Sequence, residues 1–431
     1  MISTANPVND HLRPGDIDRQ PLVPQRFAMR NGKIINYFVD EGMELVKMDF
    51  VFEAGTALQD KAFQAASAIN LVTEGTSVHS SRDIAEFFDF RGIIVEKTND
   101  EVSSTLTVYS MPRYADQLLP LLHEMFADAV YPEAEFEVFI AKRRQQLMAN
   151  FQRTSYVARK QWCECIYGKD HPQARYALPA DLDVLTVEDV RSFHRRFLTP
   201  SRMDIVLGGA VSASLLELFD NVFGADAVVP VERLALPVPE PQSPGRYDVR
   251  LENAVQNTLR VGRLLPMRWD DRQYAEFMVL STALGGYFGS RLMSNIREEK
   301  GYTYGINAMT QISRGTISFF IVSDVAADKA EPALQEINRE LQRLRNELLP
   351  VDELELVRMC MLGDFMRSVD GVFERSERFC QMMTTGVDER FTDNYMSVLE
   401  PGGVTAQRLQ ELASQLLDPS TMVAVNCGVK G

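Results

Sequence analysis

The sequence of 431 residues contains few of the side chains that build metal or disulfide centres. Its five histidines form no H-E-x-x-H, H-x-x-E-H or zinc-finger spacing with one another, so a self-contained zinc centre is not predicted. Its five cysteines are odd in number and scattered, which is not a disulfide framework. Cys163 and Cys165 form a C-x-C, but positions i and i+2 of a helix point apart. Reduced, buried thiols are therefore expected.

Several other features are missing, and each absence excludes a class of protein. No G-x-S-x-G serine elbow or G-K-[ST] phosphate loop occurs, although the segment LGGYFGS at 284–290 is rich in glycine. No apolar run of about 18 residues occurs, so no membrane span is expected. The N-terminus is polar and lacks a signal-peptide pattern, which predicts a cytoplasmic protein, or a periplasmic one if a signal was trimmed.

Basic residues are fewer than acidic ones, 45 against 60, for a net charge of −15. Binding to nucleic acid phosphates normally requires a basic face, so nucleic acid is not expected as a partner. A cationic peptide would suit this charge. A need for solubility alone explains the acidity better.

The chain consists of two halves in which the order of elements recurs. The pair Ser81-Arg82 is followed ten residues later by Gly92, and the pair Ser290-Arg291 is followed at the same distance by Gly301. Both landmarks share one offset of 209 residues, which indicates a duplication. The alternation of strands and helices predicts an α+β fold of two tandem homologous domains, each a mostly antiparallel sheet with helices packed on one face.

Five prolines crowd into the segment between the two halves, which indicates an extended linker. The predicted organisation is an N-terminal extension at 1–25, a first domain at 26–225, the linker at 226–246 and a second domain at 247–431.

Segments in both halves of the sequence resemble a known family. The segment GSRLMSNIREEKGYTYGI at 289–306 is similar to the hallmark segment of the pitrilysin/insulinase family, the inverted zincins that include the mitochondrial processing peptidases. In the first half, RNGKIINYFVD and VFEAGTALQD resemble the opening strands of that family's catalytic domain. The resemblance covers nearly the whole chain after about residue 25 and implies a peptidase-like protein.

The resemblance also implies that the zinc site has been lost. Active members carry H-x-x-E-H on the helix before the Gly75-Thr76 pair, with two histidines as ligands and the glutamate as base. Here Ala66 and Asn70 stand at the histidine positions and Ile69 at the glutamate position. The third ligand, a glutamate further along, falls in the segment 141–150, AKRRQQLMAN, which has no carboxylate. No metal and no catalytic residue are expected in this chain alone.

Two substrate-binding residues of the family have counterparts in the second half. Arg297 and Tyr304 have the family's spacing of seven residues, and in the family such a pair holds the peptide and stabilises its reacting carbonyl. The alternative is that Arg297 only pairs with Glu298 or Glu299 and that Tyr304 is a packed strand residue. The zinc-free subunit of the mitochondrial processing peptidases carries a glycine-rich substrate loop, whereas QISRGTISFF has one glycine. A role in a bacterial peptidase is therefore favoured over a role in mitochondrial presequence processing.

The resemblance implies a function as a non-catalytic, zinc-free subunit of a heteromeric zinc endopeptidase. Such a chain would supply Arg297, Tyr304 and half of a chamber around a peptide substrate. Zinc is expected in a paralogous partner subunit, in a heterodimer, and a homodimer is the other assembly considered. The alternative function is that of an inactive homologue acting as a structural scaffold or a peptide-binding protein.

Overall fold

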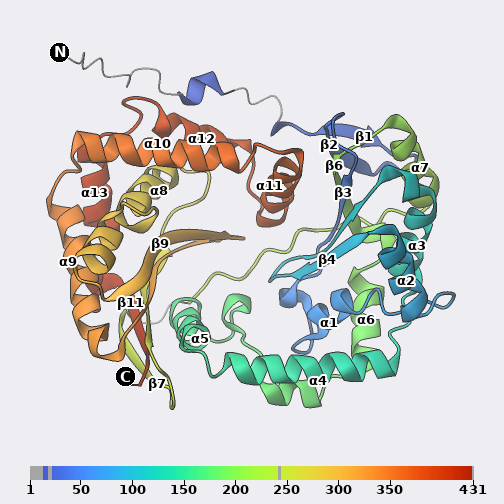
Figure 1. Cartoon of the computed structure of the whole chain (residues 1–431), viewed down its shortest axis with the longest axis horizontal. Helices are drawn as coiled ribbons and strands as arrows, with labels where there is room; N and C mark the ends of the chain where they lie inside the picture. Colours follow the sequence, from blue (N-terminus) through green and yellow to red (C-terminus); the bar gives the residue numbers. More distant parts are fainter. Residues whose placement is uncertain (1–12, 18–21, 241–243, 430–431) are drawn as a thin grey trace. The chain divides into compact units, whose positions relative to one another are not determined.

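The computed structural model describes residues 13–17, 22–240 and 244–429 and divides the chain into two compact units (Figure 1). The N-terminal unit comprises Val23–Pro241 together with Ser368–Gly386. The C-terminal unit comprises Gln242–Arg367 and Val387–Gly431, with the described N-terminal residues up to Leu22. The expected extension at 1–25 lies mostly outside the described residues. In the expected linker, residues 227–240 form neither helix nor strand, and 241–243 lie outside the described part.

The N-terminal unit contains a six-stranded sheet in the order β1-β2-β6-β3-β5-β4. Only β2 and β6 run parallel among its neighbouring strands, so the sheet is mostly antiparallel. Its strands are β1 (Gln25–Ala28), β2 (Ile34–Val39), β3 (Val46–Phe52), β4 (Ile94–Asn99), β5 (Ser104–Ser110) and β6 (Met203–Gly209).

The C-terminal unit repeats this topology with five strands in the order β7-β11-β8-β10-β9. The parallel pair is β7 with β11, and the other neighbours are antiparallel, as in the first sheet. The edge strands β4 and β9 begin at Ile94 and Thr303, which are separated by the offset of 209 residues found in the sequence. The strands are β7 (Gly245–Arg250), β8 (Asn257–Leu265), β9 (Thr303–Ser313), β10 (Thr316–Val325) and β11 (Val423–Gly428). The structure therefore confirms the predicted fold class.

Helices cover one face of the first sheet and enclose the core of the N-terminal unit. Phe50 of β3 and Phe126 of α3 have ring centroids 5.3 Å apart, and both side chains are fully buried. Most helical residues of this core come from α1 (Gln64–Asn70), α2 (Ser81–Arg91), α3 (Ala115–Asp128), α6 (Val187–Phe197) and α7 (Ala213–Phe223). Between α3 and α6 the chain forms the longer α4 (Glu133–Asn150) and then α5 (Thr154–Tyr167).

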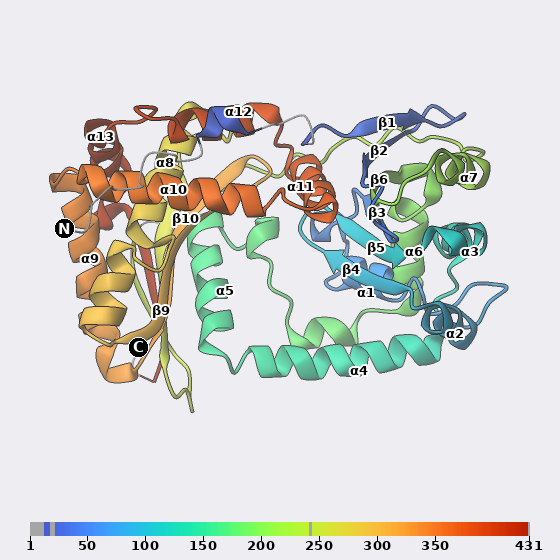
Figure 2. The same ribbon diagram turned by 45° about the horizontal axis from the view of Figure 1, so that its top comes forward.

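The other face of the first sheet carries α11 (Val372–Thr385), a helix from the second half of the sequence (Figure 2). Phe38 of β2 and Phe379 of α11 meet edge to face, with ring centroids 6.0 Å apart. Gly208 of β6 allows this approach, because a Cβ there would lie 3.2 Å from the carbonyl oxygen of Val372. The second domain expected from the sequence, 247–431, includes this helix, whereas in the structure the helix belongs to the N-terminal unit.

A buried ion pair lies between β3 and α11. Lys47 Nζ is 2.7 Å from Asp49 Oδ2, and both side chains are buried. Thr107 Oγ1 donates to the other carboxylate oxygen at 2.7 Å, and Lys47 also reaches Ser376 Oγ at 3.4 Å. Burial by itself lowers the pKa of Lys47, but the Asp49 carboxylate outweighs burial and holds that pKa above its usual value. Charge pairing therefore accompanies the packing of α11 on the sheet.

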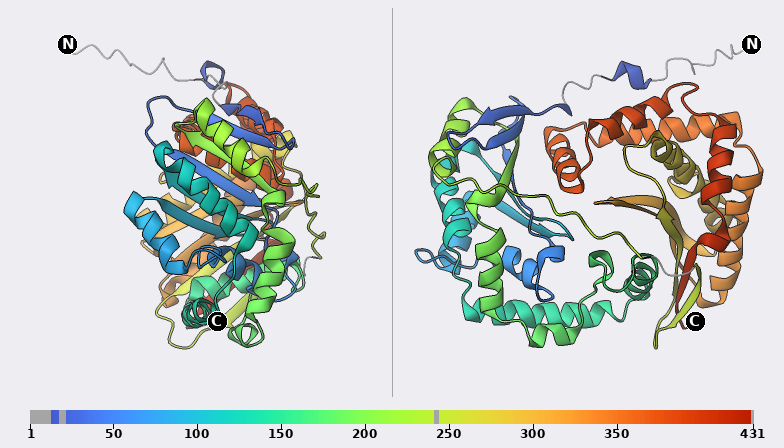
Figure 3. Two further views of the ribbon diagram at one scale, coloured as in Figure 1. Left: turned by 90° about the vertical axis from the view of Figure 1, so that its right-hand side faces the viewer. Right: turned by 180° about the vertical axis from the view of Figure 1, so that it is seen from behind.

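The C-terminal unit has its own core, in which Phe277 and Phe319 pack edge to face with ring centroids 5.2 Å apart. Figure 3 shows helices of this unit lying beside its sheet. Its helices are α8 (Arg272–Gly285), α9 (Ala330–Asn346), α10 (Val351–Arg367), α12 (Glu389–Leu399) and α13 (Ala406–Leu416). Between α8 and β9 the chain forms the π-helical turn η8 (Met293–Glu299), which belongs to the hallmark segment. In the part of the chain that the structure describes, no helix is both long and apolar enough to cross a membrane.

Candidate functional site

All three vacated positions lie on α1. Ile69, the residue expected at the position of the catalytic glutamate, has no solvent exposure and belongs to the hydrophobic core. Asn70 turns its side-chain amide back onto its own helix, where it donates to the carbonyl oxygen of Ala66 at 2.8 Å. An alkyl group, a methyl group and an amide satisfied within the helix leave no set of metal ligands.

A lysine adds a positive charge beside this helix. Lys97 of β4 donates to the carbonyl oxygen of Asn70 at 2.8 Å and to Thr73 Oγ1 at 2.6 Å. Burial lowers the pKa of Lys97, while the nearby Glu74 carboxylate partly opposes that effect. An ammonium at the C-terminal end of α1 interacts favourably with the helix dipole. The same charge would repel a divalent cation held by side chains of this helix, because like charges close together offset the attraction between a metal and its ligands.

The helix expected to supply a third ligand also carries cations. In α4, burial lowers the pKa of Arg143, whose guanidinium lies 5.4 Å from the centroid of the Phe139 ring. Its neighbour Arg144 forms an ion pair with Asp183 at 2.6 Å. Across residues 13–17, 22–240 and 244–429, no group of three or more His, Cys, Asp or Glu side chains is placed to hold a metal ion.

A buried histidine near α1 makes contacts that join two helices. His194 of α6 accepts at Nδ1 from the Tyr131 hydroxyl at 2.5 Å and donates from Nε2 to the carbonyl oxygen of Phe126 at 2.8 Å. The Tyr131 hydroxyl also lies 3.0 Å from the carbonyl oxygen of Ala68 on α1. Burial lowers the pKa of His194 to about 4, so the ring is neutral and ties α6 to α1.

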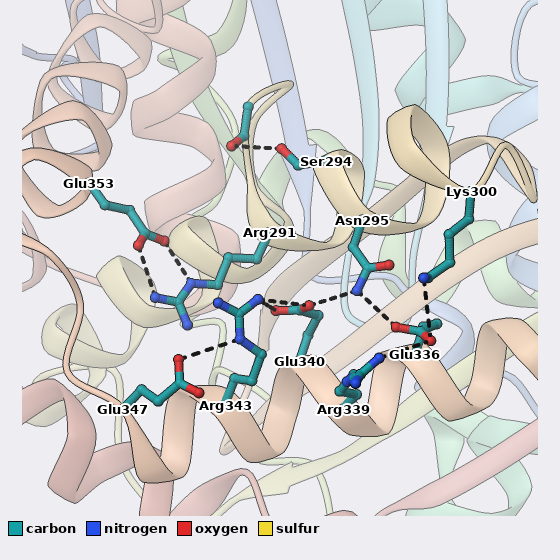
Figure 4. Close-up of polar contacts among 11 residues, drawn as sticks. Arg291, Ser294, Asn295, Lys300, Glu336, Arg339, Glu340, Arg343, Glu347 and Glu353 are labelled. Atoms are coloured by element: carbon teal, nitrogen blue, oxygen red, sulfur yellow. Dashed lines mark hydrogen bonds and ion pairs between the residues drawn. The ribbon is translucent and has the colours of Figure 1, made fainter.

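In the C-terminal unit, the polar side chains of the hallmark segment fasten it to two helices (Figure 4). Arg291 forms two hydrogen bonds to the Glu353 carboxylate of α10, at 2.8 and 2.9 Å. Asn295 donates to Glu336 at 3.0 Å and to the buried Glu340 at 2.7 Å, both on α9. A bidentate arginine pair and a buried carboxylate with charge-assisted bonds fix the position of η8.

Arg297 has different partners from Arg291 and Asn295. Its guanidinium lies over the Phe288 ring, 4.6 Å from the centroid, and Phe288 is 63% exposed. Its ion pair with Glu298 is long, at 3.5 Å, and half exposed. An exposed pair of this length contributes little, so the guanidinium stays available to a ligand.

Tyr304 lies at the start of β9, the edge strand of the second sheet, and its side chain is fully exposed, at 101% of the reference area. The alternative that Tyr304 is a packed strand residue does not describe this position. A phenol with no burial is a hydrogen-bond donor that has lost none of its freedom to meet a ligand.

The structure thus places the vacated positions on α1 of the N-terminal unit, and Arg297 and Tyr304 on consecutive elements of the C-terminal unit. The sequence interpretation had not singled out Lys97. It stands in the strand pattern IVEKTN, and nothing local to that pattern tells which helix end the ammonium contacts.

Comparison with known proteins finds similarity to peptidases in both sequence and fold. Residues 185–360 match the family model described as the peptidase M16 inactive domain. The uncharacterized zinc protease YmxG of Bacillus subtilis is 22% identical over 358 residues, which cover 82% of this chain and 85% of that protein. The chain is therefore similar to peptidases of the M16 family and to proteins named zinc proteases. The uncharacterized zinc protease Rv2782c of Mycobacterium tuberculosis is 28% identical over 58% of this chain and 59% of that protein.

Solved structures share the fold over nearly the whole chain. A peptidase M16 inactive domain from Pseudomonas fluorescens superposes with a TM-score of 0.79 at 20% identity, covering 94% of this chain and 98% of that one. A protease from Helicobacter pylori gives 0.80 at 16% identity, covering 94% and 100%. These likenesses concern the fold, and the chemistry of this chain rests on its own residues.

Proposed function

We propose that this chain is the zinc-free subunit of a heteromeric pitrilysin/insulinase-like endopeptidase. The observation that carries the proposal is a contrast between the two units. In the N-terminal unit, the position of the catalytic base is a fully buried isoleucine, Ile69. In the C-terminal unit, Tyr304 is fully exposed and Arg297 has a long, half-exposed ion pair, which suits the substrate-binding role proposed for these two residues.

The chemistry that this chain offers is hydrogen-bond donation. A guanidinium and a phenol are suitable donors to the oxyanion that develops when a peptide carbonyl is attacked. Neither group can generate the nucleophile, since the base and metal ligands are missing from α1. Zinc and the activating glutamate would therefore belong to a paralogous partner subunit, and the peptide would be held between the two chains.

The open edges β4 and β9 support the peptide-binding part of this proposal. Each is the last strand of its sheet, so its outer backbone groups have no neighbouring strand among the described residues. An extended peptide can add to such an edge through main-chain hydrogen bonds, which give affinity without strict dependence on sequence. This mode suits turnover of varied oligopeptides.

The proposal is tested with Tyr304→Phe in the mixed complex of this chain and its zinc-bearing paralogue. Loss of an oxyanion donor typically costs about 100-fold or more in kcat, so we expect a fall of that size with little change in KM. Tyr302→Phe, which removes a hydroxyl two residues away, is the matched control and should leave turnover unchanged.

Assembly must be measured beside turnover, for instance by analytical ultracentrifugation of each variant with the paralogue. Assembly with unchanged turnover for Tyr304→Phe would defeat the role of Tyr304. A parent chain that binds the paralogue without any hydrolysis in the mixture would support the scaffold function in place of the subunit function.

A further inference from the structure

The exposure of Tyr304 depends on an irregularity in β9. Along most of the strand the side chains alternate, with Ile306 and Ala308 buried and Asn307 and Met309 exposed. Continued backward, this alternation would place residue 304 on the same side as Ile306, facing the core. Instead Tyr304 is fully exposed.

The cause is a β-bulge at the start of β9. Ser323 of β10 pairs with Ile306, whereas Val325 pairs with Thr303. Two steps along β10 therefore oppose three steps along β9, so β9 holds one extra residue at this point. A bulge of this kind reverses the facing of the side chains beyond it and commonly re-aims a residue at a functional site. Here it turns Tyr304 outward.

Two hydroxyl groups hold the bulge in place. Thr303 Oγ1 accepts from the Gly305 backbone N–H at 3.1 Å and lies 2.7 Å from the carbonyl oxygen of Asp324 on β10. Ser323 Oγ is 3.0 Å from Thr303 Oγ1 and 2.9 Å from the carbonyl oxygen of Gly305. Backbone groups left unpaired by the extra residue are thereby satisfied by side chains.

We propose that Thr303 and Ser323 are positioning residues, which keep the bulge formed so that the Tyr304 phenol faces outward toward a bound peptide. The geometric part of this proposal concerns the isolated chain. Its consequence for turnover rests on the proposed function. Without the two hydroxyls, β9 regains an uninterrupted pairing with β10, and residue 304 turns toward the core.

The experiment uses Tyr304→Cys in the full chain as a probe and measures the rate of thiol alkylation under native conditions. The parent chain supplies the background of its five free cysteines, of which Cys163, Cys165 and Cys427 are buried. We expect the introduced thiol to react nearly as fast as an unfolded one. Adding Thr303→Val and Ser323→Ala together should slow that reaction at least about tenfold, because a thiol turned toward the core is shielded from the reagent. Ser323→Ala alone should have a smaller effect and serves if the double variant fails to fold.

Thr310→Val is the matched control, because it removes a hydroxyl of the same strand that contacts Tyr274 at 2.9 Å, away from the bulge. It should leave the alkylation rate unchanged. In the mixed complex, Thr303→Val with Ser323→Ala and Tyr304 intact should lower kcat and spare KM. Equal alkylation rates with and without the hydroxyls would overturn the positioning role. In another outcome, the hydroxyl substitutions slow alkylation while the mixture of the parent chain and the paralogue never hydrolyses peptide. That result would uphold the positioning role of Thr303 and Ser323 and contradict only the proposed function.

Discussion

At the scale of single residues, Ile69 determines what α1 can do. Its side chain has no exposure and packs among core residues that include Ala65 and Ala68. A carboxylate at this position is tolerable in a peptidase because a metal and a water molecule accompany it. In this chain the same position has become part of the packing.

Restoring the glutamate alone should therefore destabilise the protein. We expect Ile69→Glu to lower the free energy of unfolding by about 3 kcal/mol or more, because an unpaired carboxyl would be buried in an apolar core. Urea denaturation measures this change. Ala66→Gln, at a half-buried position of the same helix, is the control and should cost about 1 kcal/mol or less. An Ile69→Glu variant as stable as the parent would show that water or a cation reaches this position.

His194 predicts a dependence of stability on pH. Its pKa of about 4 in the folded chain lies below the usual value of about 6.5. Between these two pKa values, His194 is protonated in the unfolded chain but neutral in the folded chain. Stability is therefore lost as pH falls from about 6.5 to 4. The loss amounts to about 3 kcal/mol by pH 4.

Unfolding free energies measured between pH 4 and 7 for the parent and for His194→Gln check this prediction. Glutamine can accept from Tyr131 and donate to Phe126 but does not titrate, so the difference between the two proteins should shrink toward low pH. Parallel pH profiles would contradict the assignment of a neutral, buried imidazole.

At the scale of elements, the sequence does not predict which sheet α11 packs against. The shared offset of 209 residues predicted the common order of elements in the two halves, and the two sheets repeat one topology because duplicated elements also pack alike. It did not predict that α11 packs on the first sheet, since the amphipathic pattern of a helix says which face is buried and not against which unit. Residues such as Lys97 and Ser323 escaped prediction for the same reason, because their partners are distant in sequence.

The buried pair beneath α11 provides the prediction at this scale. Lys47→Met should cost about 3–5 kcal/mol, because it leaves the Asp49 carboxylate buried without its cation. The double variant Lys47→Met with Asp49→Leu should recover most of that loss, since two apolar groups need no partner. Thermal and urea unfolding of the single and double variants measure the difference. A double variant less stable than Lys47→Met would mean that the charge pair itself holds α11 on the sheet.

At the scale of the whole molecule, the two units share one topology but have diverged in chemistry. The N-terminal unit has an apolar residue, Ile69, where the sequence resemblance predicts the base, and Lys97 contacts the end of the same helix. The C-terminal unit keeps its hallmark segment fastened by Arg291 and Asn295, with Tyr304 exposed at the sheet edge. This division is what a chain needs if it binds peptide for a catalytic centre that lies elsewhere.

The most direct test of this account is the zinc content and peptide hydrolysis of the purified chain, measured alone and after mixing with a zinc-bearing paralogue. We expect zinc far below one ion per chain and no hydrolysis for the chain alone, with hydrolysis appearing in the mixture. One zinc per chain together with hydrolysis by the chain alone would contradict it, and would mean that the metal site lies at residues other than Ala66, Ile69 and Asn70.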